Sequence, residues 1–424
     1  MPATEEMYER VVREGSRRRR KRGRLLFGAS VLIVVAIATP FVLRHGQRTD
    51  GVVATIDGTT PSSSATTVTT TSPPGSTVPS EPAWSSQPNP PGLAGYLAHV
   101  TCPTRTRCYA VGAVPQGSGE IIASTDGGDT WHVQTTVLPP NANSFAFSGV
   151  ACMTDIDCVA VGQALSTTQL TALAVVTHDG GQSWTSAPLP PVIANLDQVT
   201  CPTTSVCLAE GFAQPPTVPS PGQNPPMIAR TTDRGSSWSL VPVPDGFATV
   251  TDIVCASSSR CILGGSDTGA DCSSCSHALV ATSDDAGASW GPAVDTGGTQ
   301  WLRDISCLDA ATCVGAANSN STQPFVPGYL TVTHDGGQTW TTVDAVNGSA
   351  VSCTANVCLA VGATYDTATN SSTATAFFYS RDTDGWTPIT PPASQGFESL
   401  ACVTDNRCIL VGSNNPPVIT TFSR

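Results

Sequence analysis

An eight-residue motif, S/T-x-D-x-G-x-S/T-W, recurs along the chain at nearly regular intervals. Its tryptophans lie 46 to 54 residues apart, and a last copy is one residue short. A strand-rich unit of about 40–50 residues is typical of a β-propeller blade. The repetition therefore predicts a structural unit used many times, rather than a local binding loop used twice. The copies span residues 124–131, 177–184, 231–238, 283–290, 333–340 and 380–386.

The cysteines provide an independent count of the units. Fourteen of the 16 form close pairs, and each pair lies between two short stretches of alternating apolar residues. This pattern predicts a β-hairpin with a disulfide across its turn, provided that the chain is exported to an oxidising compartment. Seven hairpins predict seven blades. The pairs are Cys102–Cys108, Cys152–Cys158, Cys201–Cys207, Cys255–Cys261, Cys307–Cys313, Cys353–Cys358 and Cys402–Cys408.

The two counts differ by one, and the chain ends explain the difference. After Cys408 the chain stops before another motif, whereas Trp84 precedes Cys102 by 18 residues, within the 13 to 21 that separate tryptophan from cysteine elsewhere. We therefore predict an all-β, seven-bladed propeller over residues 84–424, in which N- and C-terminal strands share the last blade. Such closure removes open sheet edges, so we expect a monomer.

The motif resembles the Asp-box (BNR) repeat of sialidase-like β-propellers, and the resemblance covers residues 84–424. Each box aspartate is expected to accept backbone N–H groups of its own turn, and the glycine two positions later to adopt a positive φ. The tryptophan is expected to begin the outermost strand and pack between blades. These residues are Asp126 and Trp131, Asp179 and Trp184, Asp233 and Trp238, Asp285 and Trp290, Asp335 and Trp340, and Asp382 and Trp386.

Two other interpretations of the boxes are weaker. Five similar aspartates could be calcium ligands, but turn bracing explains them better, and His178 and His334 are expected to be exposed turn residues. A true sialidase would, by the resemblance, need three arginines, a Tyr/Glu nucleophile pair and an Asp acid/base. The Phe/Tyr-Arg-x-Pro signature is absent, and no tyrosine has an obvious glutamate partner.

The N-terminal segment predicts a membrane anchor. Residues 1–24 hold nine of the 20 Lys+Arg, and residues 25–43 are uncharged and largely apolar. We predict a basic cytoplasmic tail (1–24), a transmembrane helix (25–43), a Ser/Thr/Pro-rich disordered linker (44–83) and an extracytoplasmic propeller. A cleaved signal peptide is the alternative, because Ala36–Ala38 resembles a cleavage site. Beyond Leu43 lie 11 arginines and 28 acids, a net charge of −17, which argues against nucleic-acid binding.

Alternating strand direction predicts that disulfide turns and boxes share one face, and that variable loops form the other. On this variable face, at the mouth of the central channel, the register places residues that no turn requires, so their removal should leave folding intact. Two of the carboxylates Asp252, Asp304 and Glu398 could form the acid pair of a glycosidase. Alternatively, all three could simply solvate the channel. The full set of ligand-binding candidates is His99, Asp197, Gln198, Asp252, Arg303, Asp304 and Glu398.

Other chemistry has little support in the sequence. Cys272 and Cys275, with His277 nearby, are expected to form a local disulfide, although a redox or metal site is the alternative. No phosphate-binding glycine loop, HExxH motif or nucleophile elbow occurs, so we expect no cofactor and no metal. The sequence favours an extracytoplasmic binding or assembly module for a cell-envelope protein or glycan. The alternative is a sialidase-like glycoside hydrolase acting on extracellular glycans.

Overall fold

The computed structural model describes residues 82–424 with internal gaps. The predicted tail, transmembrane helix and nearly all of the linker lie outside the described residues, as do Cys272 and Cys275. Within the described residues, no helix is long and apolar enough to cross a bilayer. The gaps are residues 115–116, 135–141, 167–168, 215–223, 268–276, 298–300, 319–328, 344–347, 367–370, 384, 393–395 and 413–416.

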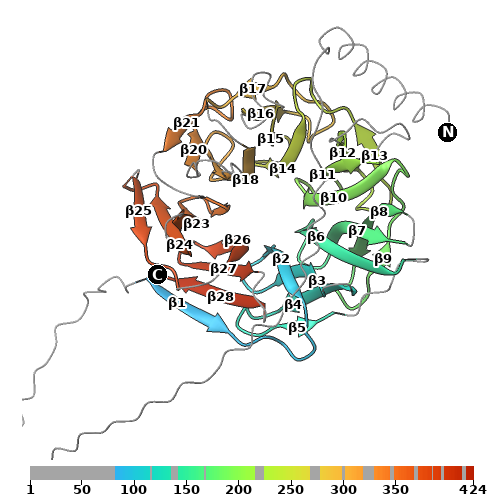
Figure 1. Cartoon of the computed structure of the whole chain (residues 1–424), viewed down its shortest axis with the longest axis horizontal. Helices are drawn as coiled ribbons and strands as arrows, with labels where there is room; N and C mark the ends of the chain where they lie inside the picture. The colour runs from blue at the N-terminus through green and yellow to red at the C-terminus, as the bar shows by residue number, and fades with distance from the viewer. Residues whose placement is uncertain are drawn as a thin grey trace, which may run out of the picture. The chain divides into compact units, whose positions relative to one another are not determined.

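Residues 83–423 form seven four-stranded antiparallel sheets arranged in a ring (Figure 1). In blades 1 to 6 the strands follow one another in sequence from the innermost to the outermost, and we number the seven blades in chain order. Blade 1 contains β2 (Tyr96–Thr101), β3 (Cys108–Ala113), β4 (Gly119–Ser124) and β5 (His132–Val133); blade 2, β6 (Ser144–Cys152), β7 (Cys158–Leu165), β8 (Leu170–Thr177) and β9 (Thr185–Ser186). Blade 3 contains β10 (Ile193–Thr200), β11 (Cys207–Ala213), β12 (Pro226–Thr231) and β13 (Ser239–Val241); blade 4, β14 (Thr249–Cys255), β15 (Cys261–Ser266), β16 (Ala278–Ser283) and β17 (Val294–Asp295). Blade 5 contains β18 (Trp301–Cys307), β19 (Cys313–Asn318), β20 (Tyr329–Thr333) and β21 (Thr341–Val343); blade 6, β22 (Ala350–Cys353), β23 (Val357–Asp366), β24 (Ser371–Ser380) and β25 (Gly385–Ile389).

Blade 7 joins the two ends of the propeller, as predicted. Its strands are β26 (Phe397–Thr404), β27 (Arg407–Gly412), β28 (Val418–Ser423) and, outermost, β1 (Ala83–Gln87). In the antiparallel pairing of β1 with β28, Trp84 lies opposite Phe422, and the two ring centroids are 4.9 Å apart. A strand from the start of the sequence therefore closes the ring.

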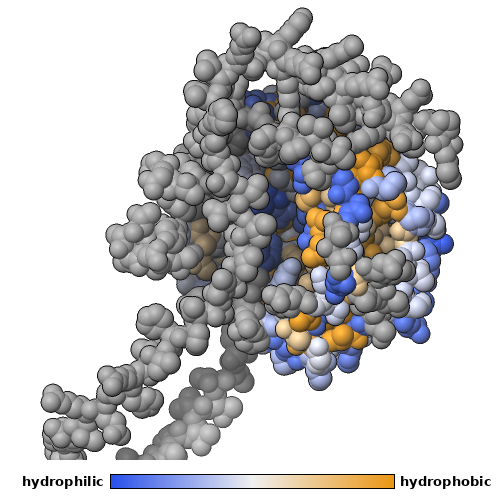
Figure 2. Space-filling view, turned by 45° about the vertical axis from the view of Figure 1, so that its right-hand side comes forward, coloured by the Kyte–Doolittle hydropathy of each residue, from blue (hydrophilic) through white to orange (hydrophobic). Residues whose placement is uncertain are grey.

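Apolar clusters fill the spaces between neighbouring blades. Tyr109 of blade 1, for example, is fully buried against Phe147 and Trp184 of blade 2. The outer surface that is visible in Figure 2 alternates orange apolar patches with blue and pale hydrophilic residues. Burial is thus concentrated between the sheets, where each blade covers the next.

All seven predicted hairpin disulfides are present. They lie at the same end of the blades as the boxes, as hydrogen bonds between the disulfide turn and the box turn of one blade show. In blade 2 the Gly180 N–H donates to the Ile156 carbonyl (3.0 Å), and in blade 1 the Gly127 N–H donates to the Thr106 carbonyl (2.7 Å). We call this end of the ring the disulfide face.

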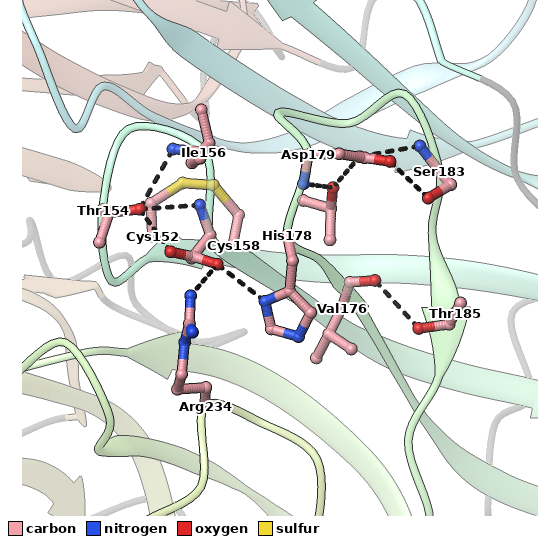
Figure 3. Close-up of polar contacts among 12 residues, drawn as sticks. Cys152, Thr154, Ile156, Cys158, Val176, His178, Asp179, Ser183, Thr185 and Arg234 are labelled. Carbon is pink, nitrogen blue, oxygen red and sulfur yellow. Dashed lines mark hydrogen bonds and ion pairs between the residues drawn. A yellow bond between two sulfur atoms is a disulfide. The ribbon is translucent and has the colours of Figure 1, made fainter.

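The box geometry of blade 2 shows what the motif does (Figure 3). Asp179 accepts the Ser183 N–H at 3.0 Å and the Ser183 hydroxyl at 2.6 Å, and Thr177 Oγ1 donates to it at 2.8 Å. The hydrogen bonds from Ser183 hold the pKa of Asp179 at about 2. Gly181 has φ +87°. The carboxylate therefore braces its own turn, as predicted.

The six copies of the motif are not equivalent. In blade 1 the paired residues Ala123 and His132 enclose residues 124–131, whereas in blade 6 Ser380 and Gly385 enclose only residues 381–384. Trp386 therefore lies inside β25, opposite Tyr379. In the other copies the tryptophan precedes the outermost strand rather than beginning it, and three are buried: Trp131, Trp184 and Trp238.

Side chains on the disulfide face also link each blade to the next. In three blades an arginine directly precedes the second cysteine and donates to the carbonyl of a glycine in the next box. These contacts are Arg107 to Gly180 (3.4 Å), Arg260 to Gly336, and Arg407 to Gly127 (3.1 Å). Each joins two turns that are separately braced, so it fixes one blade relative to its neighbour.

The junction of blades 2 and 3 reverses this arrangement (Figure 3). The residue before the second cysteine is Asp157, which is 4% exposed, and Arg234 of the next box donates to it. Arg234 occupies the position of Gly180 in blade 2 and has φ +63°, a conformation that costs a non-glycine residue free energy. His178 Nδ1 lies 2.8 Å from the same carboxylate. His178 is thus an exposed turn residue, as expected, but it is also bonded.

This reversal predicts the outcome of a charge exchange. Asp157→Arg alone should lower the free energy of unfolding by about 2 kcal/mol, because it places a cation beside Arg234 and His178. Arg234→Gly alone should cost less than about 1 kcal/mol, because the Arg234 side chain is 51% exposed, His178 and Thr154 still bond Asp157, and glycine tolerates the positive φ. The double variant reproduces the arginine-to-glycine pattern of three other junctions and should recover most of the loss. Urea denaturation measures all three, and a double variant no more stable than Asp157→Arg would contradict the interpretation.

Candidate functional site

Six of the seven innermost strands contain a β-bulge at the same height. In each, two buried residues lie three positions apart instead of two, so the intervening pair interrupts the alternation, as for Ala98 and His99 between Leu97 and Val100. A bulge redirects the extra side chain. The innermost strand of blade 6 pairs without interruption over Ala350–Cys353. The intervening pairs are Ala98/His99, Ser148/Gly149, Asp197/Gln198, Thr251/Asp252, Arg303/Asp304 and Glu398/Ser399.

The first residue of these pairs faces the channel mouth. Five of the six first residues line a cavity of about 380 Å³, which we call the mouth pocket. Six of the seven predicted ligand-binding residues line it, and Asp252 does not. Four polar residues of the lining were not predicted: Tyr96, Ser148, Ser349 and Ser399. The lining comprises Tyr96, Ala98, His99, Ser148, Asp197, Gln198, Arg303, Asp304, Ser349, Val351, Glu398, Ser399 and Leu400.

The second residue of four of these pairs binds the next blade. Asp252 Oδ2 accepts the Ile305 N–H at 2.6 Å, and Asp304 Oδ2 accepts the Val351 N–H at 2.7 Å. His99 Nδ1 accepts the Val150 N–H at 3.4 Å, and Ser399 Oγ accepts the Val100 N–H at 3.2 Å. These side chains therefore connect blades around the channel, a structural role that we did not predict for Asp252, Asp304 and His99.

One ion pair spans the mouth pocket. Arg303 of blade 5 donates to Glu398 of blade 7 at 3.0 Å, past blade 6, whose innermost strand has no bulged residue to fill the gap. Both side chains remain partly exposed, at 45% and 34%. Two residues singled out from the sequence thus meet across the site.

Burial shapes the protonation of the pocket wall. It raises the pKa of Asp304 to about 6, and it raises the pKa of Asp197 as well. Burial together with the nearby charge of Asp304 raises the pKa of Asp252 well above its ordinary value. The pKa of His99 is lowered to about 4, again by burial, so its imidazole is neutral at physiological pH.

A further buried carboxyl, Glu210, was not predicted. It lies on β11 opposite Gln198, at a position where other blades have an apolar residue such as Val111, Val161 or Val411. It is fully buried, and neither carboxylate oxygen meets a donor at full hydrogen-bond geometry. Burial and the charges of Asp197 and Asp252 raise its pKa well above 4.5. The acidic residue within the apolar run 207–213 was the sequence signal.

A second cavity of about 300 Å³ adjoins the first, and Asp197 lines both. We call it the side pocket. Trp301, at the start of β18, is 38% exposed and forms part of its wall. The lining is largely apolar: Asp197, Gly211, Phe212, Asn224, Pro226, Ala248, Thr249, Val250, Thr251 and Trp301.

The chemistry open to this site is limited. Two of the three acid candidates, Asp252 and Asp304, already accept backbone N–H groups, and the third, Glu398, is paired with Arg303. In the part of the chain that the structure describes, no group of three or more His, Cys, Asp or Glu could hold a metal ion. The site combines a polar cavity, the mouth pocket, with a largely apolar one, the side pocket. This combination is suited to binding a ligand.

The sequence matches no protein-family model and no curated protein. Several solved structures are similar to this chain at low sequence identity. One is titled YCF48 bound to D1 peptide (TM-score 0.53, 13% identity, 81% of this chain and 97% of that chain). Another is the GH74 enzyme of Niastella koreensis (TM-score 0.54, 14% identity, 78% of this chain and 52% of that chain), and the Xanthomonas campestris GH74 xyloglucanase scores similarly (0.53, 15%, 78% and 52%). This chain thus spans about half the length of the GH74 enzymes. At such identity, the likeness shows the fold alone.

Proposed function

We propose that this protein is a binding module without catalytic activity, and that its ligand occupies the mouth pocket. The observation that carries the proposal is the set of six aligned bulges. They turn side chains from different blades toward one point, and five of these side chains line one cavity. Side chains held by separate rigid sheets form a preorganised site, which limits the entropy lost on binding.

The proposed setting is the extracytoplasmic side of a membrane, with residues 25–43 as the anchor. Seven hairpin disulfides favour an oxidising compartment, because such bonds rarely persist in the cytosol. The apolar run and the basic residues before it favour an anchor with its N-terminus in the cytoplasm. The ligand would then be a cell-envelope protein or glycan. A similar single propeller, YCF48, has been solved with a bound peptide.

Glycoside hydrolysis is the second candidate. It draws on the raised pKa of Asp304, about 6, which would suit a general acid, and on the likeness to GH74 propellers. The backbone hydrogen bonds of Asp252 and Asp304 weigh against it, because a carboxylate that ties two blades together is poorly placed to exchange a proton with a substrate.

A panel of chromogenic glycosides separates the two candidates. We expect the full chain to cleave none of them faster than an Asp304→Asn variant does. Turnover by the full chain that is lost in both Asp304→Asn and Glu398→Gln would overturn the binding proposal.

Binding itself is tested on peptide and glycan arrays. Arg303→Ala removes the mouth ion pair, so it should change the binding profile without changing the melting temperature by more than a few degrees. The matched control is Arg381→Ala, which removes an ion pair of similar exposure with Asp309 on the disulfide face. An equal effect of the two variants would contradict a site at the mouth pocket.

A further inference from the structure

We propose that the ligand is a protein segment that places a lysine or arginine side chain in the mouth pocket and a neighbouring apolar side chain in the side pocket. This inference rests on the proposed binding function and narrows it to one class of ligand.

The charge of the mouth pocket is the first argument. Asp197, Asp304 and Glu398 line it against one cation, Arg303, and that cation is already paired with Glu398. The lining therefore holds three carboxylates against a single cation. The other arginines with assigned partners lie on the disulfide face or its box turns: Arg107, Arg230, Arg234, Arg260, Arg381 and Arg407.

A buried carboxyl behind the pocket wall also favours a cationic ligand. Glu210 is fully buried beside Asp197, and neither of its oxygens is satisfied by a hydrogen bond of full geometry. An ammonium or guanidinium group bound nearby would favour the ionised form of this buried carboxyl, whereas an anionic ligand would oppose it. The net charge of −17 beyond Leu43 would also attract a basic partner over a longer range.

The side pocket is the second argument, and it favours a peptide over a sugar. Trp301, Phe212 and Pro226 supply its apolar walls. Its two threonine hydroxyls are already engaged, Thr249 with Ser266 Oγ at 2.7 Å and Thr251 with the Leu302 carbonyl. A sugar ring would bury several hydroxyls here with few partners, which is costly, whereas an apolar side chain needs none.

The two cavities share Asp197, so a single ligand can occupy both. In an extended segment, side chains one or two positions apart are separated by only one or two steps of about 3.3 Å along the backbone. Because the two cavities share a wall residue, a basic residue and an apolar residue close to it in sequence can reach both.

The test uses the full 424-residue chain and an array of hexapeptides. The third position is Lys, Arg, norleucine or Glu, and the flanking positions are Leu, Phe or Ser. We expect binding to concentrate on Lys or Arg flanked by Leu or Phe. Replacing that Lys with norleucine, which has a similar shape but no charge, should weaken binding by about tenfold or more. This comparison leaves the protein unchanged, so it does not depend on the folding of a variant.

Protein variants then test which pocket binds the basic side chain of the ligand and which binds the apolar one. Asp197→Asn should weaken the lysine peptides by about tenfold, whereas Asp284→Asn, an 81% exposed aspartate on the disulfide face, removes the same charge and should have no effect. Trp301→Ala should weaken only peptides with a flanking Leu or Phe. Leu165→Ala is its control, because Leu165 is 48% exposed and lines neither pocket.

The outcomes separate this inference from the proposed function. A preference for Glu peptides, equal binding of the Lys and norleucine peptides, or binding only to glycans would overturn the inference and leave a binding module in place. Glycoside turnover that depends on Asp304 would overturn both.

Discussion

Deletion of Ala83–Gln87 is expected to lower the free energy of unfolding by more than about 5 kcal/mol and to cause aggregation. These five residues form β1, the outermost strand of blade 7, and every one of them pairs with β28. Their loss exposes the edge of β28 together with the apolar ring of Phe422, which otherwise packs against Trp84. Size-exclusion chromatography and thermal denaturation of the full-length chain and the deletion variant measure both effects.

Point variants refine this prediction. Trp84→Ala should cost about 2–4 kcal/mol, because the indole is partly buried against Phe422 and Phe397. Ser86→Ala, an exposed neighbour on the same strand, should stay within about 0.5 kcal/mol. Removal of five residues from the Ser/Thr/Pro-rich stretch 60–70 should be harmless. A deletion of β1 no more damaging than that control would show that the ring does not depend on the shared blade.

The second large effect concerns the two buried glutamates of the propeller, which we expect to respond in opposite directions. Glu120 accepts the N–H groups of Ala94 and Gly95 at 3.0 and 2.9 Å, so Glu120→Val should cost about 2–4 kcal/mol by leaving both donors unpaired. Glu210 has no such pair of donors and stands where three other blades have valine. Glu210→Val should therefore stabilise the fold at pH 8, by about 1–3 kcal/mol.

The pH dependence follows from the raised pKa of Glu210. Between the unfolded pKa near 4.5 and the higher folded value, the folded state holds more protons than the unfolded state. Stability of the parent therefore falls as pH rises through this window, and Glu210→Val removes that loss. The gain should shrink toward zero near pH 4. Urea denaturation at pH 4, 6 and 8 tests this, and a gain that does not grow with pH would contradict a buried, ionising carboxyl.

His99 works in the opposite direction. Its folded pKa of about 4 lies below the unfolded value of 6.5, so its contribution to stability is present above pH 6.5 and is lost as pH falls toward 4. The pH dependence of the parent's unfolding free energy therefore combines opposing contributions from Glu210 and His99. The difference between Glu210→Val and the parent isolates the contribution of Glu210.

The blade count was predictable because every blade has a cysteine pair and six of the seven also have a box, so two independent motifs give nearly the same count. Averaging over seven copies revealed the position of Trp84, although no box precedes Cys102. The same repetition placed six of seven candidate residues in one pocket. In a repeat fold, residues at equivalent positions of the aligned units lie at equivalent places in the structure, so a correct alignment already predicts which residues lie near one another.

The bulges were missed although the sequence shows them. Alternation in a strand puts core residues two positions apart, but Leu302 and Ile305 are three apart, as are Val250 and Ile253. We treated the two residues between each buried pair as one group. The bulge instead turns the side chain of the first toward the channel and, in four blades, lets the second bond to the next blade. The link from Asp157 to Arg234 could not be predicted, because it depends on how two blades are rotated relative to each other.

The pairing of β1 with β28 has a consequence for synthesis. Trp84 and Phe422 are made at opposite ends of the propeller, and protein chains leave the ribosome N-terminus first. Neighbouring blades can fold in turn as they emerge, but β1 cannot pair until β28 has left the ribosome. A chain truncated before Val418 can never satisfy β1 or the outer edge of β27. Only a chain translated through Ser423 can therefore cover both edges, and we expect products interrupted before Val418 to be more sensitive to proteases than the closed propeller.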